Sequence, residues 1–236
     1  MADLKTRLMQ LLDLEHAFQL QFFADFPGEA ARSGTWEQWS LKDELAHVVA
    51  WELNALARIA ALIHAEPVPD FSDYERLNRA IFDTNRDRKL ADIVAESDRA
   101  RVDFVALIQA VSVEDLAQPG RFSDQEARSL ADQILNNGFE HPIVHYANFY
   151  QQRGELAKGT QLYQAGVVAV ADWPEQYGNA RYNLACFYAL SGQIELALAE
   201  LREALQLRPN LIEWSKQDLD LAALRAEPAY EALYEA

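Results

Sequence analysis

Two histidines, His141 and His145, stand four residues apart in the segment 136–146. On a helix this spacing places both imidazoles on one face, one turn apart. Two imidazoles arranged in this way can bind the same small ion or molecule, which is usually a divalent metal ion. The best candidate for a third ligand is His47. Three neutral imidazoles would leave one or more coordination positions for water or a substrate, as catalytic sites require.

Carboxylates and aromatic residues stand near these histidines in the sequence. Glu140 directly precedes His141, and Glu44 lies about one turn before His47, so either carboxylate could orient a ligand or carry a proton. The side chains that we expect around the substrate are Trp39, Trp51, Asn78 and Tyr146. Simpler roles stay open, because a helical histidine often only completes a core, tryptophans often only pack, and Asn78 could satisfy a backbone group.

Helical periodicity predicts the elements that hold these residues. Apolar residues recur at helical spacing, and proline and glycine separate the segments. We expect helices from Leu4 to Pro27, from Ser40 (capped through Asp43) to Pro67, from the segment 70–73 to near Arg86, from Leu90 to Ala110, and from near Ser123 through the histidine pair, with a kink at Pro142. Strand signals are nearly absent. The sequence therefore predicts an all-α fold that begins with a four-helix bundle.

An internal repeat occupies the C-terminal part of the chain. The segment 147–150 with Gly154 matches the segment 185–188 with Gly192 at one constant offset. Residues 178–211 resemble a tetratricopeptide repeat in the placement of their small and large packing residues. We expect a bundle over 1–153 and tetratricopeptide-like helical hairpins over 154–236, with the last bundle helix continuing into the first repeat helix.

Three separated motifs resemble one family. Residues 36–52, with His47 and Trp51-Glu52, are similar to helix two of the DinB-like four-helix bundles. Residues 74–88, which include Asn78, resemble the ClbS/DfsB-like branch, and Asn137 with Glu140, His141 and His145 is similar to the last helix of the family. The resemblance covers roughly residues 1–150. It implies a divalent metal ion, zinc or nickel, held by His47, His141 and His145.

The same resemblance narrows the chemistry without naming a substrate. Relatives of this type include thiol-cofactor transferases and isomerases, and the ClbS branch hydrolyses a reactive cyclopropane. We therefore expect a metal-dependent hydrolase or thiol transferase that acts on a small electrophilic molecule. The alternative is a non-catalytic interaction module, in which the repeat segment binds a peptide or another protein. The resemblance also makes a homodimer the expected assembly, and the tail could serve only that purpose.

The composition limits which partners the protein can bind and indicates its cellular compartment. The chain has 37 acidic and 21 basic residues, a net charge of −16, and such a surface repels nucleic acid and anionic membranes. No apolar run approaches the roughly 20 residues that cross a bilayer. The N-terminus lacks the layout of a signal peptide, and the single cysteine, Cys186, excludes an intrachain disulfide. These features predict a cytoplasmic protein.

Overall fold

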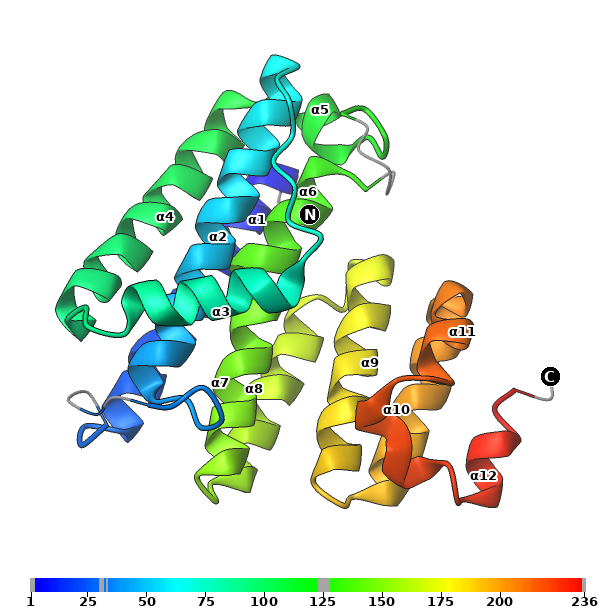
Figure 1. Ribbon diagram of the computed structural model, residues 1–236. Coiled ribbons are helices and arrows are strands. Elements are labelled where there is room, and N and C mark those ends of the chain that lie inside the picture. Colours follow the sequence, from blue (N-terminus) through cyan, green and yellow to red (C-terminus); the bar gives the residue numbers. More distant parts are fainter. Residues whose placement is uncertain (1–2, 30–31, 33, 123–127, 235–236) are drawn as a thin grey trace. The chain divides into compact units, whose positions relative to one another are not determined.

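The computed structural model describes residues 3–29, 32, 34–122 and 128–234, and over these residues the chain is helical with no β-strand (Figure 1). This confirms the all-α prediction. The chain divides into two compact units, Met1–Tyr146 and Ala147–Ala236. The division falls inside helix α7, and the predicted boundary after residue 153 lies just beyond the last residue of that helix.

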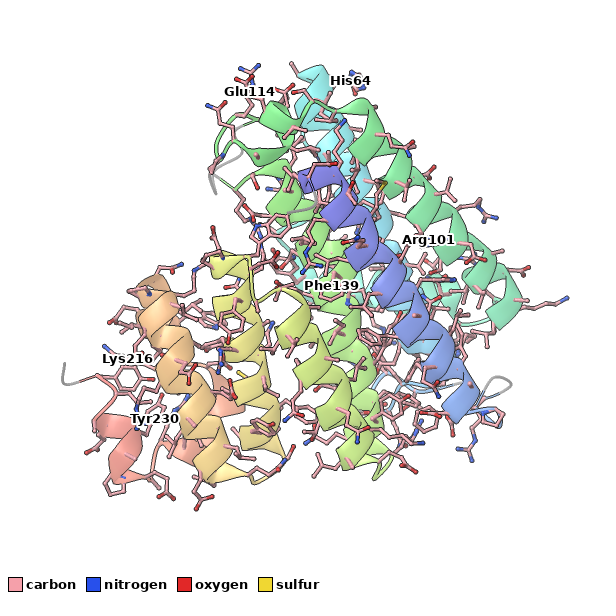
Figure 2. The ribbon with its side chains drawn as sticks, turned by 180° about the vertical axis from the view of Figure 1, so that it is seen from behind. His64, Arg101, Glu114, Phe139, Lys216 and Tyr230 are labelled. Atoms are coloured by element: carbon pink, nitrogen blue, oxygen red, sulfur yellow. The ribbon has the colours of Figure 1, made fainter. Side chains whose placement is uncertain are left out.

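The first unit is a bundle in which α2 is the central element. Its helices are α1 (Leu4–Asp25), α2 (Leu41–His64), α3 (Tyr74–Asn85), α4 (Leu90–Ala110), α5 (Val113–Ala117), α6 (Leu130–Leu135), the π-helical turn η1 (Asn136–Glu140) and the start of α7 (His141–Gln152). Helix α2 packs against α3, α4, α6 and η1, and α1 packs against α4. Arg101 of α4 pairs with Asp13 of α1 at 2.8 Å on the outside of the bundle (Figure 2).

Local signals set most of the helix boundaries. The Ser40 hydroxyl accepts from the Asp43 backbone N–H, and the Asp43 carboxylate accepts from the Ser40 backbone N–H, which confirms the predicted cap of α2. Helix α4 spans Leu90–Ala110 as predicted. The predicted start near Ser123 lies outside the described residues, and the described helix α6 begins at Leu130. The short helix α5 was not predicted, because its five residues offer too little periodicity.

The expected irregularity at Pro142 takes the form of the π-helical turn η1. The His141 backbone N–H bonds to the Asn136 carbonyl, five residues back. We attribute the wider turn to the proline ring, which would otherwise crowd the carbonyl of Gly138. An added Cβ at Gly138 would lie 2.8 Å from Leu12 Cδ2 of α1, so the end of the leucine side chain would have to shift.

Gly34 holds the loop that carries the two tryptophans onto the start of α2. Its backbone N–H donates to Asp43 Oδ2 at 3.0 Å. A Cβ at this position would collide with Asp43 Oδ2 and the Ser40 backbone nitrogen, and would lie 2.7 Å from the Gln38 carbonyl. We expect Gly34→Ala to lower the free energy of unfolding by about 2–3 kcal/mol, as overpacking does. Urea unfolding would measure this effect. Gly28→Ala, whose Cβ would meet nothing within 4 Å, is the matched control, and equal stabilities of the two variants would contradict the prediction.

The second unit consists of α-helices and short 3₁₀ segments. After the remainder of α7 come α8 (Leu156–Ala169), α9 (Pro174–Leu190), α10 (Ile194–Leu207), η2 (Pro209–Leu211), α11 (Ile212–Ser215), η3 (Leu219–Leu224) and α12 (Pro228–Glu231). Helix α9 packs against α10, α8 and η3. The first helix of each repeat copy ends in the same kind of turn, because Gly154 and Gly192 both have positive φ, 79° and 73°. In both copies the residue after the glycine donates to a carbonyl five residues back, Tyr150 or Tyr188.

Contrary to the expectation that no segment is apolar enough to cross a bilayer, helix α2 is long and apolar enough by length and composition alone. Core helices of globular proteins meet the same criterion, so this is weak evidence. Helix α2 also buries Lys42, Glu44 and Glu52, and it forms the middle of the bundle.

Candidate metal centre and its pocket

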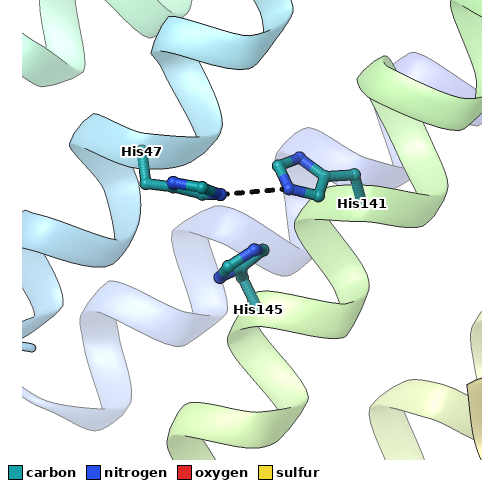
Figure 3. Close-up of side chains that lie close together, drawn as sticks. All are labelled: His47, His141 and His145. Atoms are coloured by element: carbon teal, nitrogen blue, oxygen red, sulfur yellow. Dashed lines mark hydrogen bonds between the residues drawn. The ribbon is translucent and has the colours of Figure 1, made fainter. Parts of the chain in front are cut away.

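Three histidine side chains from α2 and α7 converge on one point (Figure 3). His47 projects from α2, while His141 and His145 project from the first turns of α7. The Nε2 atoms of His47 and His141 lie 3.2 Å apart. One ligand atom from each of the three histidines lies within 4.8 Å of the others. The structure therefore brings together the three residues that the sequence singles out.

The donor set fits a divalent metal ion. Two nitrogens bound to one tetrahedral zinc ion at about 2.0–2.1 Å lie roughly 3.3–3.4 Å apart. The 3.2 Å between the Nε2 atoms of His47 and His141 is close to this value. Three imidazole nitrogens are a ligand set that zinc and nickel both accept.

Burial keeps two of the imidazoles neutral. Loss of solvent, with a smaller contribution from the nearby His145, lowers the pKa of His47 from 6.5 to about 2. Loss of solvent, followed by the proximity of His145 and His47, lowers the pKa of His141 well below its ordinary value. A neutral imidazole offers the lone pair that a metal ion binds, so both side chains are in the ligand form at physiological pH.

Glu44 positions the third histidine. Its Oε2 lies 2.8 Å from Nδ1 of His145, and the Glu44 side chain is buried. A carboxylate on Nδ1 fixes the tautomer that presents Nε2 and makes the imidazole a stronger ligand. Glu44 therefore stands behind the ligand and does not line the pocket.

We expect Glu44→Gln to weaken metal binding by about 10–100-fold while the fold persists, because the carboxamide cannot supply the negative charge behind His145. Competition with a chromogenic chelator would measure the affinity. Glu66→Gln, an exposed change just beyond α2, should leave the affinity unchanged. Equal affinities for the Glu44 and Glu66 variants would show that Glu44 has no such role.

A pocket of about 440 Å³ opens beside the histidines, a size that suits a small molecule. Its lining consists of aromatic, carboxamide and basic side chains with one alanine: Trp39, His47, Trp51, Asn54, Ala55, Arg58, Phe71, Tyr74, Asn78, Arg128, Gln133, Asn136, Asn137, His141 and His145. The pocket and the candidate metal centre therefore form one site.

The two predicted tryptophans lie on the wall of this pocket. Trp39 stacks on His145 with ring centroids 6.3 Å apart and planes at 10°. The Trp51 indole N–H donates to Asn78 Oδ1 at 2.9 Å, and its ring packs against Tyr74 at 5.5 Å. Asn78 thus lines the pocket as expected and also holds Trp51 in place.

Tyr146 and Glu140, which the sequence predicts as site residues, are not among the residues that line the described pocket. Tyr146 is fully buried, stacks on Phe22 at 4.7 Å and donates to Glu15 at 3.1 Å. Glu140 is also buried and is not part of the described pocket lining. Each is the immediate neighbour of a histidine, and one residue along a helix turns the side chain by about 100°. A residue next to a histidine in the sequence therefore lies on a different face of the helix from that histidine.

Sequence reasoning missed several polar lining residues that share a simple signal. Gln133 and Asn137 precede His141 and His145 in steps of four, which makes one polar stripe along α6, η1 and α7. On α2 a similar stripe follows His47 and Trp51 and reaches Asn54 and Arg58. Extending the histidine face by two turns in each helix identifies these residues, whereas Asn136 lies off the two stripes, as does Arg128 in the loop before α6.

Comparison with known proteins gives one finding. A family model described as the DinB superfamily matches residues 20–149, the span that contains the three histidines. No curated protein and no solved structure matches the chain.

Proposed function

Because the chain belongs to the DinB superfamily, whose model matches more than half of its length, we propose that it binds a divalent metal ion through His47, His141 and His145. We further propose that it is a metal-dependent hydrolase or thiol transferase for a small electrophilic molecule. The observation that carries the proposal is the convergence of three imidazoles at the edge of a pocket of about 440 Å³. Zinc and nickel both suit this ligand set.

Such an ion would act as a Lewis acid and would lower the pKa of a bound water or thiol. The chain itself supplies the positioning. Glu44 holds His145 in the tautomer that presents Nε2. Trp39 and Trp51 cover part of the site with apolar surface, which limits the access of bulk water to a reactive electrophile.

Hydrolysis and thiol transfer differ only in the nucleophile, so one assay can test both. Metal-loaded and chelator-treated protein would be offered a reactive epoxide and an aryl halide, with and without a low-molecular-weight thiol. We expect turnover with loaded protein only, and none with His145→Ala. Equal rates for loaded protein, stripped protein and the His145 variant would reject the enzymatic proposal.

A second candidate function is protein binding by residues 154–236, including a homodimer contact. It is favoured by large apolar side chains that the second unit leaves in solvent, among them Trp214 at 56% and Leu219 at 79% exposure. Light scattering of the full chain and of Trp214→Ser with Leu219→Ser would test self-association. A dimer that becomes a monomer in the double variant supports this function, and an unchanged mass argues against it.

A further inference from the structure

Three aromatic side chains that line the pocket form one cluster. They are Trp51 of α2, Phe71 in the segment before α3, and Tyr74, the first residue of α3. The ring of Trp51 contacts both of the others, with its centroid 6.2 Å from that of Phe71 and 5.5 Å from that of Tyr74. These three residues are called the aromatic cluster below.

Packing within the bundle does not account for the aromatic cluster. Tyr74 is 61% exposed and Phe71 is half-buried. Helix α3 buries Phe82 and Asn85, whereas its first two turns, residues 74–81, bury no side chain. Large apolar side chains that line a pocket and stay in contact with solvent are expected to meet a ligand.

The aromatic cluster lies next to the candidate metal centre. Trp51 follows His47 by about one turn on α2, and their ring centroids are 6.3 Å apart. The Trp51 indole N–H donates to Asn78 Oδ1, and Asn78 lies one turn after Tyr74 on α3. Trp51 thus contacts a metal ligand as well as the two other rings, so a small molecule that packs on the aromatic cluster lies beside the three histidines.

We infer that the aromatic cluster binds an aromatic ring of the substrate, so that the substrate is an electrophile with an uncharged aromatic group next to its reactive carbon. Contacts between aromatic rings stabilise a complex beyond the effect of the buried area alone. The inference rests on the proposed function to the extent that it names the substrate class of the same site. The binding of the ring depends on side chains other than the three histidines, so it can be tested without a metal ion.

A suitable probe is 2-naphthalenemethanol, because it is neutral and has no thiol or carboxylate that would bind a metal ion. Decahydro-2-naphthalenemethanol has the same carbon skeleton without the aromatic rings and serves as the comparison. Calorimetry with chelator-treated full-length protein would measure the Kd of both alcohols. We expect the aromatic alcohol to bind about fivefold more tightly than the saturated one.

Variants assign this preference to the aromatic cluster. Phe71→Ala and Tyr74→Ala should each weaken the binding of the aromatic alcohol by about three- to tenfold, and the double variant should bind the two alcohols alike. Tyr74 is mostly in solvent, so Tyr74→Ala is sufficient for the test if Phe71→Ala does not fold. Trp214→Ala removes an exposed aromatic side chain from the second unit, outside the pocket, and is the matched control.

Several results would overturn the inference. One is an aromatic alcohol that does not bind up to its solubility limit, and another is equal affinity of the wild type for the two alcohols. Full affinity in the double variant would place the ligand on other side chains. A trimethylammonium derivative of the same aromatic ring system that binds more tightly than the alcohol would make the cluster a cation site. A dimer that Tyr74→Ala converts to a monomer, with no binding of the alcohol, would assign the exposed ring to a contact between two copies of the chain.

Failure of this inference and failure of the proposed function give different results. A chain that prefers the aromatic alcohol but has no affinity for metal ions would reject the proposed function and keep the ligand class. A metal-dependent enzyme that shows no preference between the two alcohols would keep the proposed function and reject the ligand class.

Discussion

Protein purified without a histidine tag or chelator is expected to contain close to one zinc or nickel ion per chain, and His47→Ala and His145→Ala are each expected to lose it. Each substitution removes one of three imidazoles that converge within 4.8 Å. A metal site with two remaining protein ligands binds far more weakly, by more than the roughly 10–100-fold that outer-shell changes cost. Elemental analysis of the three proteins after gel filtration would measure the metal content.

A matched control is available on the same helix. His64 lies at the end of α2, is exposed and stands outside the pocket, so His64→Ala should keep the metal. His141→Ala should behave like the other two ligand variants. Wild-type protein that folds and carries no metal after growth with zinc and nickel would contradict the assignment. So would a loss of metal that His64→Ala causes to the same degree.

The parts of the fold that the sequence predicts well depend on local signals. The Ser40–Asp43 cap is contained within four residues, and the limits of α4, Leu90–Ala110, follow from punctuation and periodicity. Spacing alone also identifies His141 and His145 as a pair. His47 could be named only as the best candidate for a third ligand, with the family resemblance in support, because its distance from the other two depends on how α2 packs against the last helix of the bundle.

Features that depend on packing between helices could not be predicted from the sequence. Sequence shows that Pro142 disturbs the last helix, but it does not show that the disturbance becomes the wider turn η1 over Asn136–Glu140. Gln133 is buried without a side-chain hydrogen-bond partner among the described residues, and this state depends on side chains from several elements. The same limit explains Tyr146, since only the phase of the assembled helix decides that it faces Glu15 rather than the ligand.

The interior of the bundle contains a second group of ionisable residues. Glu15 of α1 accepts a hydrogen bond from Tyr146, and Gln19 donates to both Tyr146 and Ser97 of α4. Burial raises the pKa of Glu15 from 4.5 to about 8, against smaller opposing effects of the Tyr146 hydrogen bond and of Arg101. Burial, together with the nearby Glu15, raises the pKa of Glu52 well above its ordinary value. Burial also raises the pKa of Tyr146, so this interior is stable when it is uncharged.

We expect the free energy of unfolding to contain a term that falls as pH rises. Below pH 4.5 Glu15 is protonated in both the folded and the unfolded chain, and its favourable contribution is complete. Between pH 4.5 and about 8 the unfolded chain releases this proton while the folded chain retains it, so stability declines with pH. A shift of this size corresponds to about 5 kcal/mol for Glu15 alone. Glu15→Gln keeps an acceptor for the Tyr146 hydroxyl and removes the titration.

The histidines oppose this trend at lower pH, so the measurement must separate the two. The lowered pKa values of His47 and His141 make stability rise with pH up to about 6.5, their ordinary pKa. This contribution is common to the wild type and Glu15→Gln and cancels in their difference. Urea unfolding of chelator-treated proteins at pH 5, 6.5 and 8 measures the free energy of unfolding of both. The value for the variant, relative to the wild type, should increase at each step in pH. The exposed change Glu37→Gln should follow the wild type throughout. A constant difference between the wild type and Glu15→Gln over this range would mean that Glu15 ionises in the folded protein as it does in water, and that its interior site is open to solvent.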